Sequence, residues 1–225
     1  MKRLLFLTIL QIVGFANCLY ATTLVGKVQG TMGVNAHGAA TYTIPLNLHD
    51  GISSFTPQLA LSYNSQGGNG LLGYGWSLSG LSSITIGPRN VYFDTVAEQI
   101  YQGSDNAYYL DGMRLLLVEG TDGQVGAKYR TESDEYNIIQ IETVLGDTPG
   151  SFFVKRTDGT VFHYGSSSGR LNYSATEAYG WALDYAIDRL GNYIQYNYST
   201  DGLTLYITSI TYGKNGSSDK CIGNQ

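Results

Sequence analysis

Cysteine, histidine and basic residues are scarce in this chain of 225 residues. It contains 2 Cys, 3 His and 13 Lys plus Arg. No internal disulfide is expected, because Cys18 belongs to a predicted leader peptide and only Cys221 would remain after its removal. His37, His49 and His163 have none of the spacings typical of zinc ligands. We therefore expect packing alone to stabilise the fold, and neither a metal nor another cofactor to be bound.

The excess of acidic residues argues against nucleic acid as a partner. Removal of the leader takes away Lys2 and Arg3 but no acid, so 11 basic residues face 18 acidic ones, a net charge of −7. Proteins that bind nucleic acid need clustered basic residues to displace counterions from the phosphates. The sequence has no such cluster.

Motifs of common enzyme classes are also missing. The glycine-rich stretch 67–75 is followed neither by Lys-Ser or Lys-Thr nor by a predicted helix, both of which a phosphate-binding loop requires. No Gly-x-Ser-x-Gly sequence is present. Asp184 and Asp188 would lie two pleats apart on one strand face, where they could act as the paired acids of a glycosidase. The stronger explanation is structural: Asp188 precedes a turn, where its side chain can bond nearby backbone N–H groups, and Asp184 is solvated. We predict no enzymatic activity, with glycoside cleavage as the enzymatic alternative.

The amino terminus has the order of a secretory signal peptide. Met1-Lys2-Arg3 precedes an uncharged stretch over 4–15, and small residues follow up to Ala21. This stretch is shorter than the roughly 20 apolar residues that span a bilayer core, which argues against a membrane anchor. Lipidation of Cys18 is an alternative, although Asn17 fits poorly with the small residue expected before a lipidated cysteine. We predict that 1–21 are removed on export, that the protein is secreted to the extracellular space, and that 22–225 form one β-domain.

The remaining composition favours an all-β fold. Gly (29) and Tyr (19) are abundant, and only 14% of the residues are charged, which suits strands joined by tight corners. Strand-like runs separated by Gly, Asn and Asp predict antiparallel hairpins that form a twisted, multi-stranded sheet. These runs cover 22–28, 41–48, 58–63, 108–110, 113–118, 152–156, 161–164, 181–187, 193–198 and 203–212.

Asp-Gly pairs predict where the hairpins turn. Asp111-Gly112 and Asp158-Gly159 each lie between two strand-like runs, and Asp-Gly supplies the positive φ values of a type I′ turn. Asp201-Gly202 is expected to turn the chain into the last strand. If Asp158-Gly159 is a two-residue loop, Val154 pairs with His163, and both side chains lie on one face.

The segment 175–190 allows either a helix or a strand. Its alanines are tolerable in a helix, but the alternation of apolar residues fits a strand better. Trp181, Leu183, Tyr185 and Ile187 would then occupy one face, and Asp184 the other.

The most informative stretch of the sequence runs from Ser62 to Leu78. Its asparagines and glycines tolerate positive φ, so a tight turn is predicted; they are Asn64, Gly67, Gly68, Asn69, Gly70, Gly73 and Gly75. Gly73 and Gly75 alternate with bulky residues, which leaves one side nearly bare and permits another strand to approach closely. We expect Trp76 to anchor the corner, and the stretch to be architectural.

The order of these motifs closely resembles the amino-terminal domain shared by the virulence-plasmid B toxin SpvB and the B subunits of insecticidal toxin complexes. The resemblance spans roughly 38–213 and rests on Ile44-Pro45-Leu46, on 56–65, on 68–78 and on the hairpin turns. A segment over 181–198 is also similar to Rhs-type shell proteins. The residues that carry it, all predicted to be structural, are Pro45, Pro57, Tyr63, Asn64, Asn69, Gly70, Gly73, Gly75, Trp76, Asp158, Gly159, Trp181, Asp188, Gly191 and Asn192.

The resemblance implies a non-catalytic part of a secreted virulence toxin, one that contributes to a β-shell enclosing or presenting a toxin payload. Its partners would be further shell segments, in the same chain or another, and the payload. We expect the domain to be incomplete at its carboxy end, so that its last, rather apolar strand pairs or aggregates through an open edge. The alternative is an extracellular carbohydrate-binding or adhesion module, because exposed Tyr and Trp can stack on sugar rings.

Overall fold

The computed structural model describes residues 28–100, 106–133, 136–166, 168–202 and 204–216. Residues 31–225 form one compact unit and 1–30 another, of which only 28–30 are described. The predicted signal peptide, 1–21, and nearly all of the predicted strand 22–28 therefore lie outside the described residues.

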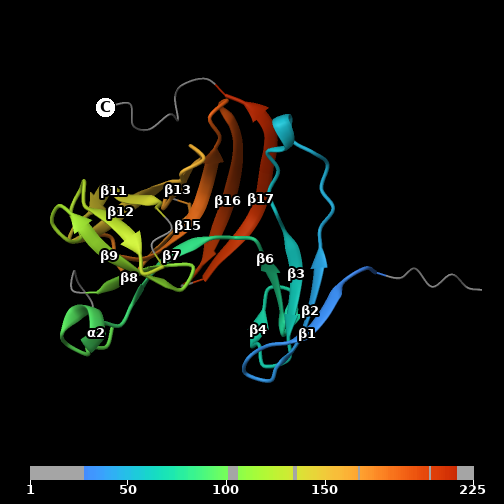
Figure 1. Cartoon of the computed structure of the whole chain (residues 1–225), viewed down its shortest axis with the longest axis horizontal. Helices are drawn as coiled ribbons and strands as arrows, with labels where there is room; N and C mark the ends of the chain where they lie inside the picture. Colours follow the sequence, from blue (N-terminus) through green and yellow to red (C-terminus); the bar gives the residue numbers. More distant parts are fainter. Residues whose placement is uncertain (1–27, 101–105, 134–135, 167, 203, 217–225) are drawn as a thin grey trace, which may run out of the picture. The chain divides into compact units, whose positions relative to one another are not determined.

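Strands make up most of the described chain, and paired strands run antiparallel, which confirms the predicted all-β class (Figure 1). One sheet has four strands in the order β1-β2-β3-β6: β1 Thr31–Val34, β2 Ala40–Pro45, β3 Ala60–Asn64 and β6 Trp76–Ser79. A small hairpin lies between β3 and β6 in the sequence, formed by β4 Asn69–Gly70 and β5 Gly73–Tyr74. The short helices are η1 Ile52–Ser54 and α2 Val91–Asp94.

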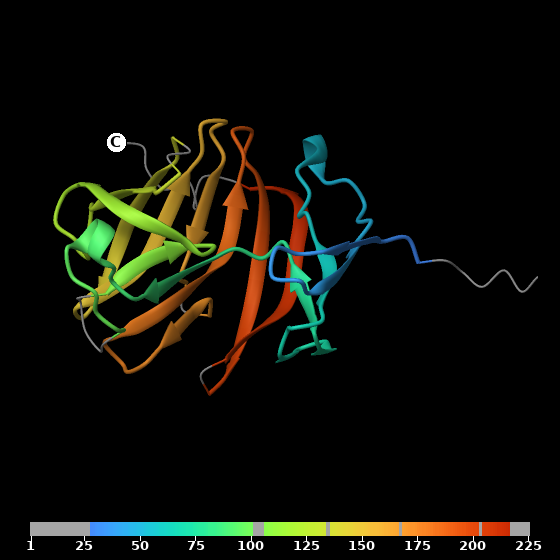
Figure 2. The ribbon, with the colours of Figure 1, turned by 60° about the horizontal axis from the view of Figure 1, so that its bottom comes forward.

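The largest sheet closes on itself into a barrel (Figures 1 and 2). Its strand order is β13-β12-β11-β10-β9-β8-β7-β15, and pairing of β15 with β13 closes the ring. The bounds are β7 Ser83–Gly87, β8 Ala107–Leu110, β9 Met113–Glu119, β10 Lys128–Thr131, β11 Ile138–Leu145, β12 Thr148–Lys155, β13 Val161–Tyr164 and β15 Ala178–Ile187.

The length of β15 makes this closure possible, because its two halves have different neighbours. Its first half pairs with β7 on one edge and with β14, Arg170–Asn172, on the other. Its second half pairs with β13 and with β16, Asn192–Asp201. The last strand, β17 Thr204–Asn215, pairs with β16 and extends the sheet beyond the ring.

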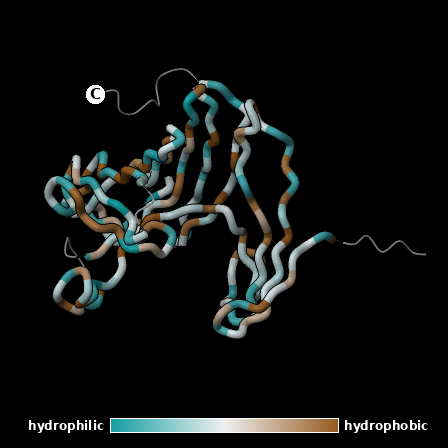
Figure 3. Tube along the Cα trace, in the orientation of Figure 1, coloured by the Kyte–Doolittle hydropathy of each residue, from teal (hydrophilic) through white to brown (hydrophobic). Residues whose placement is uncertain are grey.

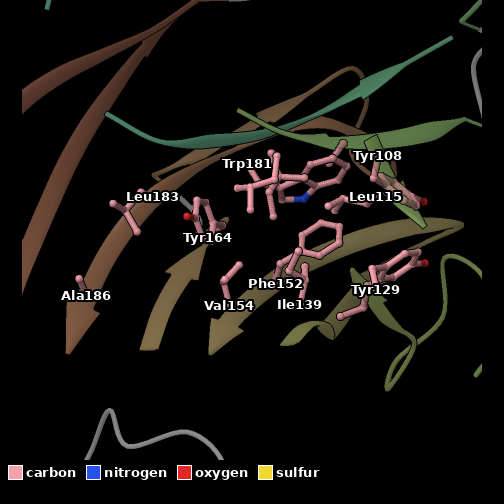
Figure 4. Packing of buried hydrophobic residues seen from close by; sticks show 14 of the residues in the cluster. Tyr108, Leu115, Tyr129, Ile139, Phe152, Val154, Tyr164, Trp181, Leu183 and Ala186 are labelled. Atoms are coloured by element: carbon pink, nitrogen blue, oxygen red, sulfur yellow. The ribbon is translucent and has the colours of Figure 1, made fainter. Parts of the chain in front are cut away.

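Aromatic and aliphatic side chains together fill the barrel interior (Figure 4). The Trp181 ring packs edge to face on Phe152, with 5.0 Å between centroids, and on Tyr108, with 5.9 Å. Its indole Nε1–H donates to the Pro149 carbonyl oxygen at 3.0 Å, so this polar atom is satisfied although the residue is only 1% exposed. Such pairs contribute beyond the area they bury. The predicted structural role of Trp181 is thus that of a core residue.

The predicted faces of β15 are wrong beyond Leu183, because a β-bulge interrupts the strand. His163 pairs with Tyr185, and Tyr164 pairs with Leu183, so Asp184 is an extra residue opposite the His163–Tyr164 step. A bulge of this kind interrupts the strict alternation of side chains. Trp181 and Leu183 therefore face the core, but the next core residue is Ala186 and not Tyr185.

The predicted register of the β12–β13 hairpin is wrong by one residue. Arg156 N–H donates to the Thr160 carbonyl at 2.9 Å, so the loop has three residues and not two. Gly159 has φ +85°, whereas Asp158 has no positive φ, which excludes type I′. Because a one-residue slip moves every side chain to the other face, Phe153 and not Val154 lies opposite His163.

The β8–β9 hairpin, in contrast, has the predicted two-residue type I′ turn. Asp111 and Gly112 have φ of 49° and 82°, and Leu110 pairs with Met113. Along the chain, hydrophobic and hydrophilic residues follow one another at short intervals (Figure 3). The segment 178–187 is a strand, as favoured over a helix.

Candidate functional site

The glycine-rich stretch forms a close backbone crossing between β3 and β6. Gly75 N–H donates to the Gly68 carbonyl, and the Gly75 carbonyl accepts from Asn64 N–H, both at 2.8 Å. A Cβ on Gly75, which has φ +76°, would lie 2.7 Å from the Asn64 carbonyl oxygen and 2.7 Å from the Tyr63 ring. Only glycine fits this position without displacing the neighbouring strand.

Trp76 lies beside this crossing and faces Tyr63 across the β3–β6 pair. Their ring centroids are 5.3 Å apart. Beyond them the β4–β5 hairpin pairs Asn69 with Tyr74 and Gly70 with Gly73, whose φ is +101°. The structure thus brings seven of the predicted structural residues together around one hairpin: Tyr63, Asn64, Asn69, Gly70, Gly73, Gly75 and Trp76.

Two prolines that were predicted to be structural lie in or beside the same sheet. Pro45 is the last residue of β2 and lies opposite Ala60. Pro57 is buried shortly before β3 begins. Both lie at strand ends, where a missing backbone N–H costs no ladder hydrogen bond.

Asp188 organises the turn from β15 to β16. Its Oδ1 accepts from the N–H groups of Leu190 and Asn192, at 2.8 and 2.9 Å, and its Oδ2 accepts from Asn192 Nδ2 at 2.8 Å. Gly191 takes φ +80° at the corner. Asn215 Nδ2 at the end of β17 then donates to Asn192 Oδ1 at 2.9 Å. Asp188, Gly191 and Asn192, all predicted to be structural, therefore hold together the ends of β15, β16 and β17.

A group of three ionisable side chains in the barrel wall centres on His163. On β13, His163 points to the face opposite the core, because its neighbours Phe162 and Tyr164 pack inward. Its Nδ1 lies 2.6 Å from Asp184 Oδ1 on β15, and its Nε2 lies 2.8 Å from Glu142 Oε2 on β11. Tyr185 stacks on the ring at 4.7 Å between centroids. We call His163, Asp184 and Glu142 the imidazole cluster.

Both carboxylates of the imidazole cluster accept a further hydrogen bond from outside the cluster. Asp184 Oδ2 accepts from the Ser166 backbone N–H at 2.5 Å, and Glu142 Oε2 accepts from the Ser151 hydroxyl at 3.1 Å. Burial alone lowers the pKa of His163. The hydrogen bond and charge of Asp184, followed by those of Glu142, outweigh burial, so the pKa is raised above its usual value.

This arrangement favours an ion triad over a nucleophile-activating site. A histidine base needs a free imidazole nitrogen to take a proton from a nucleophile. Here each ring nitrogen is engaged by a carboxylate, and the Ser151 hydroxyl is bound to Glu142 and not to the ring. The structure also gives no support to Asp184 and Asp188 as the paired acids of a glycosidase. The Asp184 carboxylate is hydrogen-bonded to His163, and the Asp188 carboxylate is hydrogen-bonded within its own turn.

Sequence reasoning missed the imidazole cluster. Glu142 and Asp184 each lie 21 positions from His163 in the chain. The bulge at Asp184 and the one-residue shift of the β12–β13 register bring the three side chains to one face. The only signal in the sequence was a histidine in a strand whose neighbours are apolar.

In the ranges that the structure describes, no group of three or more His, Cys, Asp or Glu could hold a metal ion. No helix within those ranges is long and apolar enough to cross a membrane.

The outer edge of β17 is the open end of the large sheet. Its inner edge pairs with β16 along its whole length, from Thr204 to Asn215, and no strand among the described residues pairs with the other edge. Lys214 is the one charged residue of β17. Natural edge strands usually carry charges, prolines or bulges that block pairing with another strand. β17 has no proline, but its register against β16 shifts at two places. Its regular, uncharged stretches, 204–207 and 209–211, are therefore the parts of this edge suited to accept a strand.

Comparisons with known proteins give a consistent result. The model of the family described as "SpvB: Salmonella virulence plasmid 65kDa B protein" matches residues 34–220. No curated protein sequence matches the chain.

Solved structures with the same fold come from toxin complexes and from an effector. The chain is 17% identical to TcdB2-TccC3, with a TM-score of 0.69, over 86% of this chain and 10% of that one. It is 19% identical to the N-terminal domain of effector protein SpvB from Salmonella typhimurium strain LT2, with a TM-score of 0.61, over 78% and 65%. It is 16% identical to the Photorhabdus luminescens Tc holotoxin pore, with a TM-score of 0.62, over 88% and 11%. The chain thus spans about a tenth of the toxin-complex chains.

Proposed function

This chain belongs to the SpvB family, and on that premise we propose that it is a non-catalytic, structural domain of a secreted toxin or toxin-delivery protein. The domain would form part of a β-shell that encloses or presents a toxin payload. Its partners would be further shell segments, in the same chain or in another, together with the payload.

The observation that carries this proposal is the outer edge of β17, which lies on the part of the large sheet that extends beyond the closed barrel. A closed ring removes its own edges, whereas the sheet that leaves the ring through β15, β16 and β17 offers the outer edge of β17 for continuation. The fold likeness to a tenth of much longer toxin-complex chains supports the same role for this chain. The polar networks around His163 and Asp188 are internally satisfied, which suits a structural part.

Strand pairing at this edge can be tested by light scattering of the full chain over a range of concentrations. We expect association that Thr204→Lys weakens, because Thr204 is exposed in a regularly paired part of β17 and a lysine there opposes pairing of another strand. Thr200→Lys is the matched control, since Thr200 is exposed on β16, a strand already paired on the β17 side. A chain that stays monomeric at every concentration, or two variants that behave alike, would contradict the edge as a contact surface. A signal on a glycan array would favour the carbohydrate-binding alternative.

Export through a leader at 1–21 belongs to the same proposal. The charged start, the uncharged stretch and the small residues before Thr22 support it. Expression in a bacterial host followed by amino-terminal sequencing should recover exported protein that begins at Thr22. Protein retained in the cytoplasm with Met1 intact would refute the export route.

A further inference from the structure

We propose that the imidazole cluster is a proton-operated clamp on the barrel wall, closed when His163 carries two N–H protons and half open when it carries one. In the closed state His163 ties β13 to both β15 and β11. In the half-open state it keeps only one of these ties. This inference does not rest on the proposed function.

The position of the clamp makes it mechanically relevant. Pairing of β13 with β15 is the step that closes the barrel, and it involves only four residue pairs, from Val161–Ile187 to Tyr164–Leu183. The His163–Asp184 contact crosses this closing seam. The His163–Glu142 contact reaches β11, two strands away, over β12. One side chain thus links both sides of the seam to the neighbouring wall.

The charged groups that face His163 are both acidic. They are Asp184 from β15 and Glu142 from β11. From β12 the cross-strand neighbour is the uncharged Phe153, and Lys155, two positions on, has an exposed side chain. Tyr185 of β15 adds ring stacking. Within the part of the chain that the structure describes, no facing group therefore replaces the charge that His163 loses on deprotonation.

Proton count decides how many ties the ring can make. An imidazolium donates from both nitrogens, whereas a neutral imidazole donates from one and presents a lone pair at the other. Asp184 is the more buried partner, with a side chain 5% exposed against 23% for Glu142. Since an unpaired charge costs more the deeper it is buried, the remaining proton stays on Nδ1. The tie to Glu142 is then the one that opens.

The direction of the pH effect follows from the raised pKa of His163. A group whose pKa is higher in the folded than in the unfolded chain stabilises the fold fully below the unfolded value, about 6.5 for histidine. That stabilisation is lost as the pH rises through the folded value. The clamp is therefore closed in mildly acidic solution and opens toward alkaline pH. Buried tyrosines titrate higher, as for Tyr196, where burial raises the pKa to about 12.

The first test uses the unaltered chain and the nitrogen resonances of its histidines. At mildly acidic pH both ring nitrogens of His163 should be protonated, with a titration midpoint above about 6.5. Amide hydrogen exchange, corrected for its intrinsic pH dependence, should accelerate in β11 as the pH rises through that midpoint. A His163 ring that is neutral in mildly acidic solution, or β11 protection that is independent of pH, would overturn the clamp.

The second test compares folding equilibria of variants over the same pH range. His163→Gln should remove the fall in stability that the unaltered chain shows above about pH 6.5, a fall of about tenfold in the folding equilibrium constant for each pH unit by which the folded midpoint is raised. Glu142→Gln should move the His163 midpoint downward. His49→Gln is the matched control, because His49 is exposed. If His163→Gln keeps the pH profile of the unaltered chain, the inference is wrong; if it does not fold, the resonances of the first test decide.

Discussion

Replacement of Trp181 by Phe should be among the most destabilising conservative substitutions in the barrel. The indole N–H satisfies the Pro149 carbonyl oxygen at 3.0 Å, and phenylalanine has no donor to replace it. A buried acceptor left without its donor costs about 1–3 kcal/mol. The smaller ring also leaves a void against Phe152 and Tyr108, at about 0.8 kcal/mol for each buried methylene-sized group lost. We expect a total loss of about 3 kcal/mol in the free energy of unfolding.

Urea unfolding and thermal melting, followed by circular dichroism, measure this loss. For a chain of this length, about 3 kcal/mol corresponds to a decrease in Tm of about 6–12 °C. The matched control is Tyr92→Phe, because Tyr92 is 86% exposed and its replacement should change stability by no more than about 0.5 kcal/mol. Equal melting of the Trp181 variant and the unaltered chain would refute both the described packing and the value assigned to the Pro149 hydrogen bond.

Four further substitutions probe the glycine crossing and the β15–β16 turn, each by thermal melting. Gly75→Ala should cost about 2–3 kcal/mol, because its Cβ would meet the Asn64 carbonyl and its φ is positive, whereas Gly68→Ala, with open space around it, should be nearly neutral; similar losses for both would contradict the crossing. Trp76→Ala should cost about 2 kcal/mol, since the ring is only partly buried, and Gly73→Val should cost about 1–3 kcal/mol from its backbone conformation alone; unchanged melting of both would show that the hairpin is not architectural. Asp188→Ala removes three hydrogen bonds and should cost about 2–3 kcal/mol, and an unaffected Tm would show that the turn forms without them.

Local features of the fold could be predicted because their causes lie in a few adjacent residues. The Asp111-Gly112 turn forms as expected because both residues tolerate the positive φ that a type I′ turn demands. Strand positions were also predictable, since alternation of apolar residues reports which faces are buried. The Asp158-Gly159 turn shows the limit of such reasoning. The same dipeptide forms a three-residue loop there, and Gly159 lies so close to Arg189 that a Cβ would be 2.5 Å from Cδ of that side chain.

The sequence by itself determined the all-β class, the main hairpins and, through the ordered Gly, Asn and Trp motifs, membership of the SpvB family. Only the tertiary structure decided that β13 meets β15, and that a bulge at Asp184 interrupts the alternation of β15. The physical reason is distance along the chain. Backbone preferences act over a few residues, whereas the imidazole cluster depends on strand register, in which one residue of slip moves His163 to the opposite face.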